Sequence, residues 1–582
     1  MIDLAHKELL SSPLTPYLQI HDHAAGEVIF QQNQMPAGCY FVESGELAAR
    51  VTDNELQRQA QLPKTFAAGE ILGLTEHLQQ QTHPYSAVAL TPVKLSFLAK
   101  DKIAALQQDV AAKQFFVELC LNNMSRQLQQ QQHAANEHSL NNANIPEVDF
   151  MVESAIAAHQ QITQWPEAKI DALLMAIANE INRHAESLAQ QTVLESNMGV
   201  AAHKIQKIGL GTISVAEQLT GKPGTGDVLL DQHDVEAMYT PMGVVFGMIP
   251  ITNPVETIVF KCLIAIKSRN AIIVSSHRKG QGVGRRTVEL IQKVLHEQGA
   301  PVNLVQTSQL PASRAVTNAF LRHEGINFIL ATGGPSMVKS AYQSGTPAIG
   351  VGKGNAPVWI CADADLSRAA QSVVSSKSFD NGIVCGSENN LLVDASIADE
   401  FVQKAEQEGA VLLTPAELKR LLSEVFASGR LGEQFVGRSA AEICELIGVE
   451  RNYPIRLILA PVRQGDIHSP LLKEKLAPVL SLSLIENDAQ ALQLARDILN
   501  NEGAGHTAII HSADKNRIRR FGETVSVSRV LVNTSGTLGC IGAANGLCLS
   551  WTLGCGTQGG GSTSDNVTYT HLLNTKRIAY NA

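Results

Sequence analysis

Long apolar runs are missing from this chain, and so is any segment that would direct it to a membrane. No stretch approaches the roughly 18 uninterrupted apolar residues that a transmembrane helix requires. The first ten residues, MIDLAHKELL, lack the basic segment followed by an apolar core that marks a secretory signal. We therefore expect a cytoplasmic protein.

Charged residues are scarce, at 17 % of the chain, and Lys and Arg form no cluster. A nucleic acid backbone is bound by clustered basic residues, and the net charge here is -9, so we expect no nucleic acid partner. The nine cysteines are an odd number without the spacing of a metal site or a disulfide framework. They indicate a reducing compartment and no bound metal. Because the charge disfavours a nucleic acid, we expect small molecules as the partners.

The 582 residues, 44 % of them hydrophobic, are sufficient for several folding units. Short β-type runs separated by Gly, Pro and Asn fill residues 20–100 and predict a small β-roll. A helical pattern then leads into a Gln-rich polar tract that ends at Pro146, and long amphipathic helices, such as one over residues 171–191, are predicted after it. Beyond Tyr239, apolar runs alternate with helical patterns, which predicts an α/β fold with parallel sheets.

The segment around Cys385 indicates the chemistry of the chain. Cys385 stands between a helical stretch and a β-type run, and Gly382 and Gly386 allow a tight turn that leaves its thiol accessible. Taken alone, a single cysteine fits a buried core thiol better than a nucleophile. The assignment therefore depends on the motifs around it.

Those motifs resemble the aldehyde dehydrogenase superfamily over residues 147–582. The run FDNGIVCGSE resembles its nucleophile loop. Other segments, in the same order along the chain, resemble the coenzyme A-acylating branch: MGVVFGMIPITNPVETIVFK, FILATGGPSMVKSA, GVGKGNAPVWICADADL, EKLAPVLSL, GAGHTAIIHS and WTLGCGTQGGGSTSDN. The resemblance implies a Rossmann-like NAD domain followed by an α/β catalytic domain.

The resemblance also implies a reaction that proceeds through a thioester. The Cys385 thiolate adds to the aldehyde carbonyl, and the side-chain amide of Asn253 with the backbone N–H of Cys385 stabilises the oxyanion. Hydride then passes to the nicotinamide ring. His506 matches a position that assists the thiol or holds the acyl group, although an ordinary polar residue at a strand entrance remains an equal alternative.

The residues that would activate water are absent. Hydrolytic members of the superfamily carry a general-base Glu where this chain has Gly350 to Gly354, a run without a carboxylate. A thiol needs less activation than water, so acyl transfer to coenzyme A is the expected outcome, with acetaldehyde as the default aldehyde. The alternatives are a regulatory or scaffold protein with a decayed dehydrogenase fold, and a hydrolytic aldehyde dehydrogenase.

The nucleotide site implied by the resemblance begins where an apolar strand ends in Thr332, Gly333 and Gly334. Glu474 matches the carboxylate that holds the nicotinamide ribose. The further cofactor-binding candidates are Pro250, Thr252, Ser275 and Gly352. Ser275 to Arg278 replace the acidic motif of the hydrolytic enzymes, which leaves room for NADP, although we favour NAD. The G-x-G-x-x-G at Gly554 to Gly559 does not open a helix, and we interpret it as a loop on the substrate side.

The first part of the chain, roughly residues 10–138, resembles the cyclic nucleotide-binding domain. Gly69 and Glu70 match the pair that would hold the cyclic phosphate and the ribose. Tyr85 stands where that family has a phosphate-binding Arg, which places binding in doubt because a charge-assisted contact is lost. A degenerate oligomerisation or docking module is the favoured alternative.

The patterns and the resemblances together predict five segments: 1–138, a cyclic nucleotide-binding-like β-roll with a C-terminal helix; 139–146, a linker; 147–358, the NAD-binding domain; 359–560, the catalytic domain; and 561–582, a C-terminal segment. We expect a homo-oligomer, with the segment THLLNTKRIAY as the candidate contact.

Overall fold

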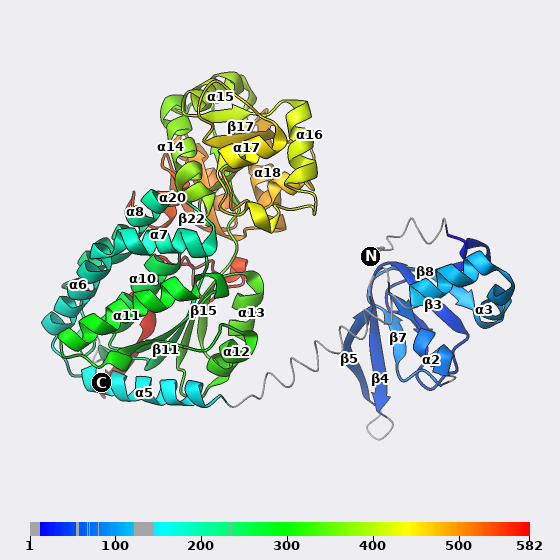
Figure 1. Cartoon of the computed structure of the whole chain (residues 1–582), viewed down its shortest axis with the longest axis horizontal. Coiled ribbons are helices and arrows are strands. Elements are labelled where there is room, and N and C mark those ends of the chain that lie inside the picture. Colours follow the sequence, from blue (N-terminus) through cyan, green and yellow to red (C-terminus); the bar gives the residue numbers. More distant parts are fainter. Residues whose placement is uncertain are drawn as a thin grey trace. The chain divides into compact units, whose positions relative to one another are not determined.

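The computed structural model describes residues 12–53, 58–66, 68, 70–79, 81–120, 145–226, 228–232 and 235–581. The chain divides into two units, Met1–Ser139 and Leu140–Ala582, coloured blue and cyan to red in Figure 1. Within the described residues, no helix is long and apolar enough to cross a bilayer.

The first unit is a β-roll, as its short strand patterns predict. One antiparallel sheet has the order β1-β8-β3-β6 and the other β2-β7-β4-β5. Their bounds are β1 Gln19–His23, β2 Val28–Phe30, β3 Gly38–Ser44, β4 Leu47–Asp53, β5 Arg58–Phe66, β6 Ile71–Leu72, β7 Ser86–Ala89 and β8 Val93–Ala99. The helices α2 (Leu74–Gln79) and α3 (Lys100–Ala105) accompany the sheets, and a further helix covers 110–120.

The second unit opens with a layer of helices: α5 Pro146–Ile162, α6 Glu167–Arg183, α7 Ala185–Ser196, α8 Ala201–Gly209 and α9 Val215–Leu219, with a π-helical turn at Leu210–Ser214 before α9. The amphipathic pattern over residues 171–191 is one run in the sequence, but the structure divides it at His184. That residue leaves the helical conformation, and its Nδ1 lies 2.9 Å from the carbonyl oxygen of Glu180. The carbonyl is thereby satisfied where the helix ends.

A five-stranded parallel sheet with the order β13-β12-β11-β14-β15 follows. Its strands are β11 Val244–Ile249, β12 Ala271–Ser276, β13 Val305–Thr307, β14 Phe328–Thr332 and β15 Ala348–Val351. Figure 1 shows α10 (Pro254–Lys267) and α11 (Gln281–Glu297) on one side of the strands, and α12 (Arg314–Arg322) and α13 (Pro335–Gln343) on the other. The strand order reverses between β11 and β14, and ligands of such sheets bind at the carboxyl ends beside that point.

A seven-stranded parallel sheet with the order β18-β19-β20-β17-β16-β21-β22 forms the other half of this unit. Its strands are β16 Ala356–Ile360, β17 Glu388–Asp394, β18 Ala410–Leu412, β19 Leu457–Pro461, β20 Val479–Ile485, β21 Gly505–His511 and β22 Val527–Val532. Apolar residues on α14 (Leu366–Ser378), α15 (Ala398–Gln407), α18 (Asp488–Asn501) and α19 (Lys515–Thr524) are buried with its strands. The amino ends of β16, β17 and β21 meet at one edge, where Cys385 lies.

The C-terminal strand β23 (Leu573–Ala579) returns to the start of this unit. It pairs antiparallel with β10 (Val235–Pro241), which also pairs with β9 (Val228–Gln232). β23 is an edge strand of this sheet, and all its side chains after Leu573 are exposed.

Candidate active site

The loop that carries Cys385 is a sharp reversal between α14 and β17. Asp380, Asn381 and Gly382 all have positive φ, at 48°, 54° and 71°. Such angles are rare outside glycine, and the buried Asp380 maintains its conformation through bonds to its neighbours. The reversal brings Cys385 to the amino end of β17, where its side chain is partly buried.

His506 is the direct neighbour of this thiol. Its Nε2 lies 3.2 Å from Cys385 Sγ, and its Nδ1 lies 2.9 Å from the hydroxyl of Thr507. The ring is fully buried at the start of β21, and burial lowers the pKa of His506 to about 3, with the charge of Arg529 adding to the effect. The imidazole is therefore neutral at pH 7, so it can accept a hydrogen bond from the thiol.

The thiol itself is protonated at rest. Burial raises the pKa of Cys385 well above its usual value, and the charge of Glu474 acts in the same direction. Arg529 opposes this, and its guanidinium donates to the carbonyl oxygens of His506 and Gly554. Sequence reasoning did not identify Arg529, which lies far from Cys385 in the chain and carries no motif.

Asn253 lies at the amino end of α10, where its side chain joins a buried ionic cluster. Its amide Nδ2 donates to Thr252 Oγ1 at 3.1 Å, and its Oδ1 accepts from Lys207 Nζ. Lys207 pairs with Glu256 at 3.2 Å and with Asp380. A second buried lysine, Lys204, also contacts Asp380 at 3.0 Å.

The ionic cluster links the proposed oxyanion donor to the reversal that presents Cys385. Asp380 also accepts from the backbone N–H of Val200 at 2.7 Å. The burial of these charges could not be predicted from the sequence, because Lys204 and Lys207 lie in an amphipathic helix, where lysine normally faces solvent.

The glycine loop from Gly350 to Gly354 packs directly against the nucleophile. A Cβ on Gly354 would lie 1.7 Å from the carbonyl oxygen of Cys385, so only glycine fits at this position. Gly352 lies beside Cys555, whose sulfur would be 3.6 Å from an added Cβ. The loop therefore places backbone atoms, and no carboxylate group, next to Cys385.

Glu474 also contacts Gly354. Its Oε1 accepts from the Gly354 N–H at 3.0 Å, and its own N–H donates to Glu502 Oε2 at 2.7 Å. Glu502 pairs through Oε1 with Lys353 Nζ, also at 2.7 Å. Burial raises the pKa of Glu474 to about 7, and the negative charge of Glu502 contributes to this. Lys353 and Glu502 are further site residues that sequence reasoning missed.

The candidate nucleotide residues lie at the carboxyl ends of the five-stranded sheet. Pro250 and Thr252 follow β11, Ser275 lies near the end of β12, and Thr332 ends β14. Among the described residues, the buried Thr332 Oγ1 has no hydrogen-bond partner.

Gly333 and Gly334 complete the turn into α13. Gly334 caps the helix, Pro335 occupies its first turn, and no atom lies within 4 Å of a Cβ added to Gly334. An unpartnered hydroxyl and free helical N–H groups at the switch point fit a phosphate-bearing nucleotide. The run from Gly554 to Gly559 is a loop with one short 3-10 turn, Thr557–Gly559, rather than a strand-to-helix turn.

Two of the three candidate cyclic nucleotide residues, Glu70 and Tyr85, lie within the described part of the roll. Gly69 lies outside the described residues, and Glu70 is half-buried beside β6, with its carbonyl accepting from the Val42 N–H at 3.0 Å. Tyr85 is only 6 % exposed, and its ring lies 5.7 Å from that of Phe66 and 5.9 Å from that of Phe30. Its side chain therefore belongs to an aromatic core inside the roll.

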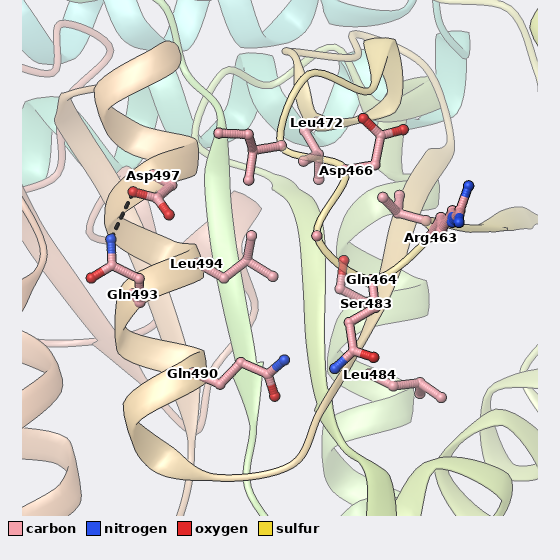
Figure 2. Close-up of a pocket in the computed structure, with 13 residues that line it drawn as sticks. Arg463, Gln464, Asp466, Leu472, Ser483, Leu484, Gln490, Gln493, Leu494 and Asp497 are labelled. Carbon is pink, nitrogen blue, oxygen red and sulfur yellow. Dashed lines mark hydrogen bonds between the residues drawn. The ribbon is translucent and has the colours of Figure 1, made fainter.

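A separate cavity of about 230 Å³ lies in the catalytic domain. Figure 2 shows Gln490, Gln493, Leu494 and Asp497 of α18 facing the loop that carries Arg463, Gln464 and Asp466. None of its lining residues is among the site residues described above. Leu472 lines the cavity two positions before Glu474.

Comparisons with known proteins agree with this geometry. Residues 128–414 match the aldehyde dehydrogenase family, and residues 20–109 match the cyclic nucleotide-binding domain. The succinate-semialdehyde dehydrogenase (acetylating) of Clostridium kluyveri is 33 % identical over 441 residues, which cover 75 % of this chain and 96 % of that protein. The bifunctional aldehyde-alcohol dehydrogenase AdhE of Escherichia coli is 34 % identical over 447 residues, 75 % of this chain, which spans only 50 % of that relative's length.

Solved structures give the same result. An acetylating aldehyde dehydrogenase from Geobacillus thermoglucosidasius is 36 % identical with a TM-score of 0.73, covering 75 % of this chain and 97 % of that one. The propionaldehyde dehydrogenase of Rhodopseudomonas palustris, solved with bound coenzyme A and an acylated cysteine, is 28 % identical with a TM-score of 0.68, covering 74 % and 97 %. The chain described here belongs to the aldehyde dehydrogenase family, and it carries an N-terminal cyclic nucleotide-binding domain.

Proposed function

We propose that this chain is a coenzyme A-acylating aldehyde dehydrogenase. It converts a short-chain aldehyde, with acetaldehyde as the default, to an acyl-coenzyme A while reducing a nicotinamide cofactor, with NAD favoured. The observation that carries the proposal is the contact of Cys385 with the neutral His506 beside a glycine loop without a carboxylate. The acetylating and acylating relatives support it.

Cys385 begins the reaction by adding to the aldehyde carbon. The thiol donates its proton to His506 Nε2, 3.2 Å away, as the sulfur attacks, and the imidazole then releases that proton to solvent. The oxyanion that forms is stabilised by Asn253 Nδ2 and the backbone N–H of Cys385. Lys207 orients the Asn253 amide by binding its oxygen, so that the nitrogen remains the donor.

Thr332, Gly333 and Gly334 would bind the phosphates of the cofactor, and Glu474 its nicotinamide ribose. When bound, the cofactor supplies the hydride acceptor that converts the adduct on Cys385 to a thioester. Gly354 lets the loop approach the backbone of Cys385 closely, and Gly352 lets it approach Cys555.

The thioester on Cys385 is then released by a thiol. Water attack requires a general base, and the loop from Gly350 to Gly354 contains none. The thiol of coenzyme A attacks the thioester carbonyl without that assistance from the loop, and acyl-coenzyme A leaves.

A coupled assay tests the proposal. Purified protein is mixed with acetaldehyde and NAD, the absorbance of the reduced cofactor is followed, and coenzyme A is then added. Sustained turnover that begins only after coenzyme A is added supports the acylating enzyme. Sustained turnover without coenzyme A would instead establish a hydrolytic dehydrogenase, and no reduction under either condition would favour a scaffold protein.

We also propose that the chain forms a homo-oligomer. The exposed edge strand β23 supports this, because unpaired backbone groups on such a strand can bind a second chain. Sedimentation of the purified protein tests this expectation, and a monomer at micromolar concentration would contradict it.

A further inference from the structure

We infer that Glu474 accepts the proton of the coenzyme A thiol during acyl transfer, in addition to its proposed role at the cofactor ribose. The inference rests on the proposed function, since it concerns the release of the thioester from Cys385. It assigns a base to the step for which the glycine loop supplies none.

The position of Glu474 relative to the nucleophile carries this inference. Gly354 approaches both residues: a Cβ added to it would lie 1.7 Å from the Cys385 carbonyl oxygen, and its N–H donates to Glu474 Oε1 at 3.0 Å. The Glu474 carboxylate and the loop that carries Cys385 therefore meet at the same glycine. The charge of Glu474 also contributes to the raised pKa of Cys385.

The backbone around Glu474 is fixed by buried polar contacts. Asn355 Nδ2 donates to the carbonyl oxygen of Leu472 at 2.8 Å, and Lys475 Nζ donates to those of Leu471 and Lys473 at 2.5 and 2.8 Å. Glu502 accepts the Glu474 N–H and pairs with Lys353. The carboxylate is therefore held in one place, which a proton acceptor at a reacting centre requires.

The proton affinities of the neighbouring groups favour Glu474 over His506. Burial lowers the pKa of His506 to about 3, so its imidazole holds a proton poorly at neutral pH. Burial raises the pKa of Glu474 to about 7, which matches a base that works near pH 7. The negative charge of Glu502 adds to this rise in the pKa of Glu474, and the positive charge of Lys353 opposes it.

The step is balanced without any further reactant. The thiol proton of coenzyme A moves to the Glu474 carboxylate while the coenzyme sulfur forms a bond to the acyl carbon. The bond from that carbon to Cys385 Sγ breaks, and Cys385 leaves as a thiolate. The proton on Glu474 then returns to Cys385, so both side chains recover their initial state.

Isotope exchange tests the inference without the nicotinamide cofactor. Labelled coenzyme A is incubated with acetyl-coenzyme A and the full-length enzyme, and the label that enters acetyl-coenzyme A through the Cys385 thioester is measured. We expect Glu474→Gln to lower the exchange rate by about 100-fold and to abolish the rise of the wild-type rate with pH around 7. The matched control is Glu445→Gln on α17 (Ala440–Ile447), an exposed residue that should keep the wild-type rate.

An acidic acceptor thiol separates proton transfer from a structural role. Thiophenol is largely ionised near neutral pH and needs no base, so Glu474→Gln should transfer the acetyl group to thiophenol at close to the wild-type rate. An equal loss with both thiols, or an unchanged exchange rate with coenzyme A, would overturn the inference. Cys385→Ser distinguishes the two proposals: exchange that persists in this variant refutes the thioester itself, and not only the role of Glu474.

Discussion

At the scale of single residues, the site depends on groups whose protonation is altered by burial. Cys385 remains a thiol at rest, His506 remains neutral, and Glu474 has a pKa of about 7. Each of these shifts arises mainly because the charged form loses contact with water. At pH 7, Cys385 and His506 are therefore both uncharged at rest.

The first residue-scale prediction concerns the nucleophile. Cys385→Ser should lower aldehyde-dependent reduction of the cofactor by roughly 10⁴-fold or more, because a hydroxyl is a far weaker nucleophile than a thiolate. Steady-state kinetics with acetaldehyde, NAD and coenzyme A provide the measurement. The control is Cys548→Ser, an exposed cysteine whose replacement should leave the rate unchanged. A Cys385→Ser enzyme with wild-type rate would refute the mechanism.

The second residue-scale prediction concerns the pH dependence of stability. The pKa of His506 is about 3 in the folded chain and about 6.5 in an unfolded chain, so the unfolded chain binds more protons between these values. Stability should fall as pH decreases below 6.5, by about 1.4 kcal/mol per pH unit for this group. Urea unfolding at pH 7 and 5 should show a smaller loss for His506→Gln, whereas the exposed His468→Gln should behave as wild type.

At the scale of elements, the glycine loop and the Cys385 reversal must fit together. Gly354→Ala places a Cβ 1.7 Å from the carbonyl oxygen of Cys385, and neither backbone can yield without moving the nucleophile. We expect kcat/KM to fall by roughly 100-fold, as misplacement by about 1 Å does elsewhere. Gly522→Ala on α19 is the control, since nothing lies within 4 Å of its added Cβ. Equal activities of the two variants would contradict this packing.

The buried ionic cluster supports the same reversal. Asp380→Asn leaves Lys204 and Lys207 with less compensating charge, and breaking a buried pair typically costs about 3–5 kcal/mol. We expect urea unfolding to show a loss of that order, accompanied by slower turnover because Asn253 and the Cys385 loop both depend on the cluster. The control Asp466→Asn changes an exposed residue, so it should alter the free energy of unfolding by no more than about 0.5 kcal/mol and leave turnover unchanged. A stable, active Asp380→Asn enzyme would show that the cluster is dispensable.

At the scale of the whole molecule, two units with separate cores share one chain. The prediction at this scale concerns the first unit. Tyr85 stands where we expect the phosphate-binding Arg of that family, and it packs against Phe66 and Phe30, so a cyclic phosphate would lack a contact that provides about 1.5–3 kcal/mol. We expect calorimetry of the full-length protein to detect no saturable binding of cyclic AMP at millimolar concentration. Heat from coenzyme A added to the same sample is the control, and a saturable cyclic AMP isotherm would contradict the prediction.

Most of the fold could be predicted from the sequence, because strand and helix periodicities are local properties. The β-roll, the alternation of strands and helices after Tyr239 and the turn at Thr332 all correspond to observed elements. The break at His184 was missed, since the apolar period continues across it and only the bond to Glu180 reveals the end of the helix. The local sequence also left the role of His506 undecided, because its contact with Cys385 joins residues that are 121 positions apart.

The order of motifs along the chain was by itself sufficient to determine the family and the absence of a carboxylate between Gly350 and Gly354, and it singled out Cys385 as the candidate nucleophile. These are properties of residue type and sequence position. Only the tertiary structure decided which charges act on the sulfur and on its loop: Arg529 and Glu474 act on the Cys385 thiol, and Lys204 and Lys207 bind Asp380. Their effects depend on separation and burial, and three-dimensional packing alone determines both.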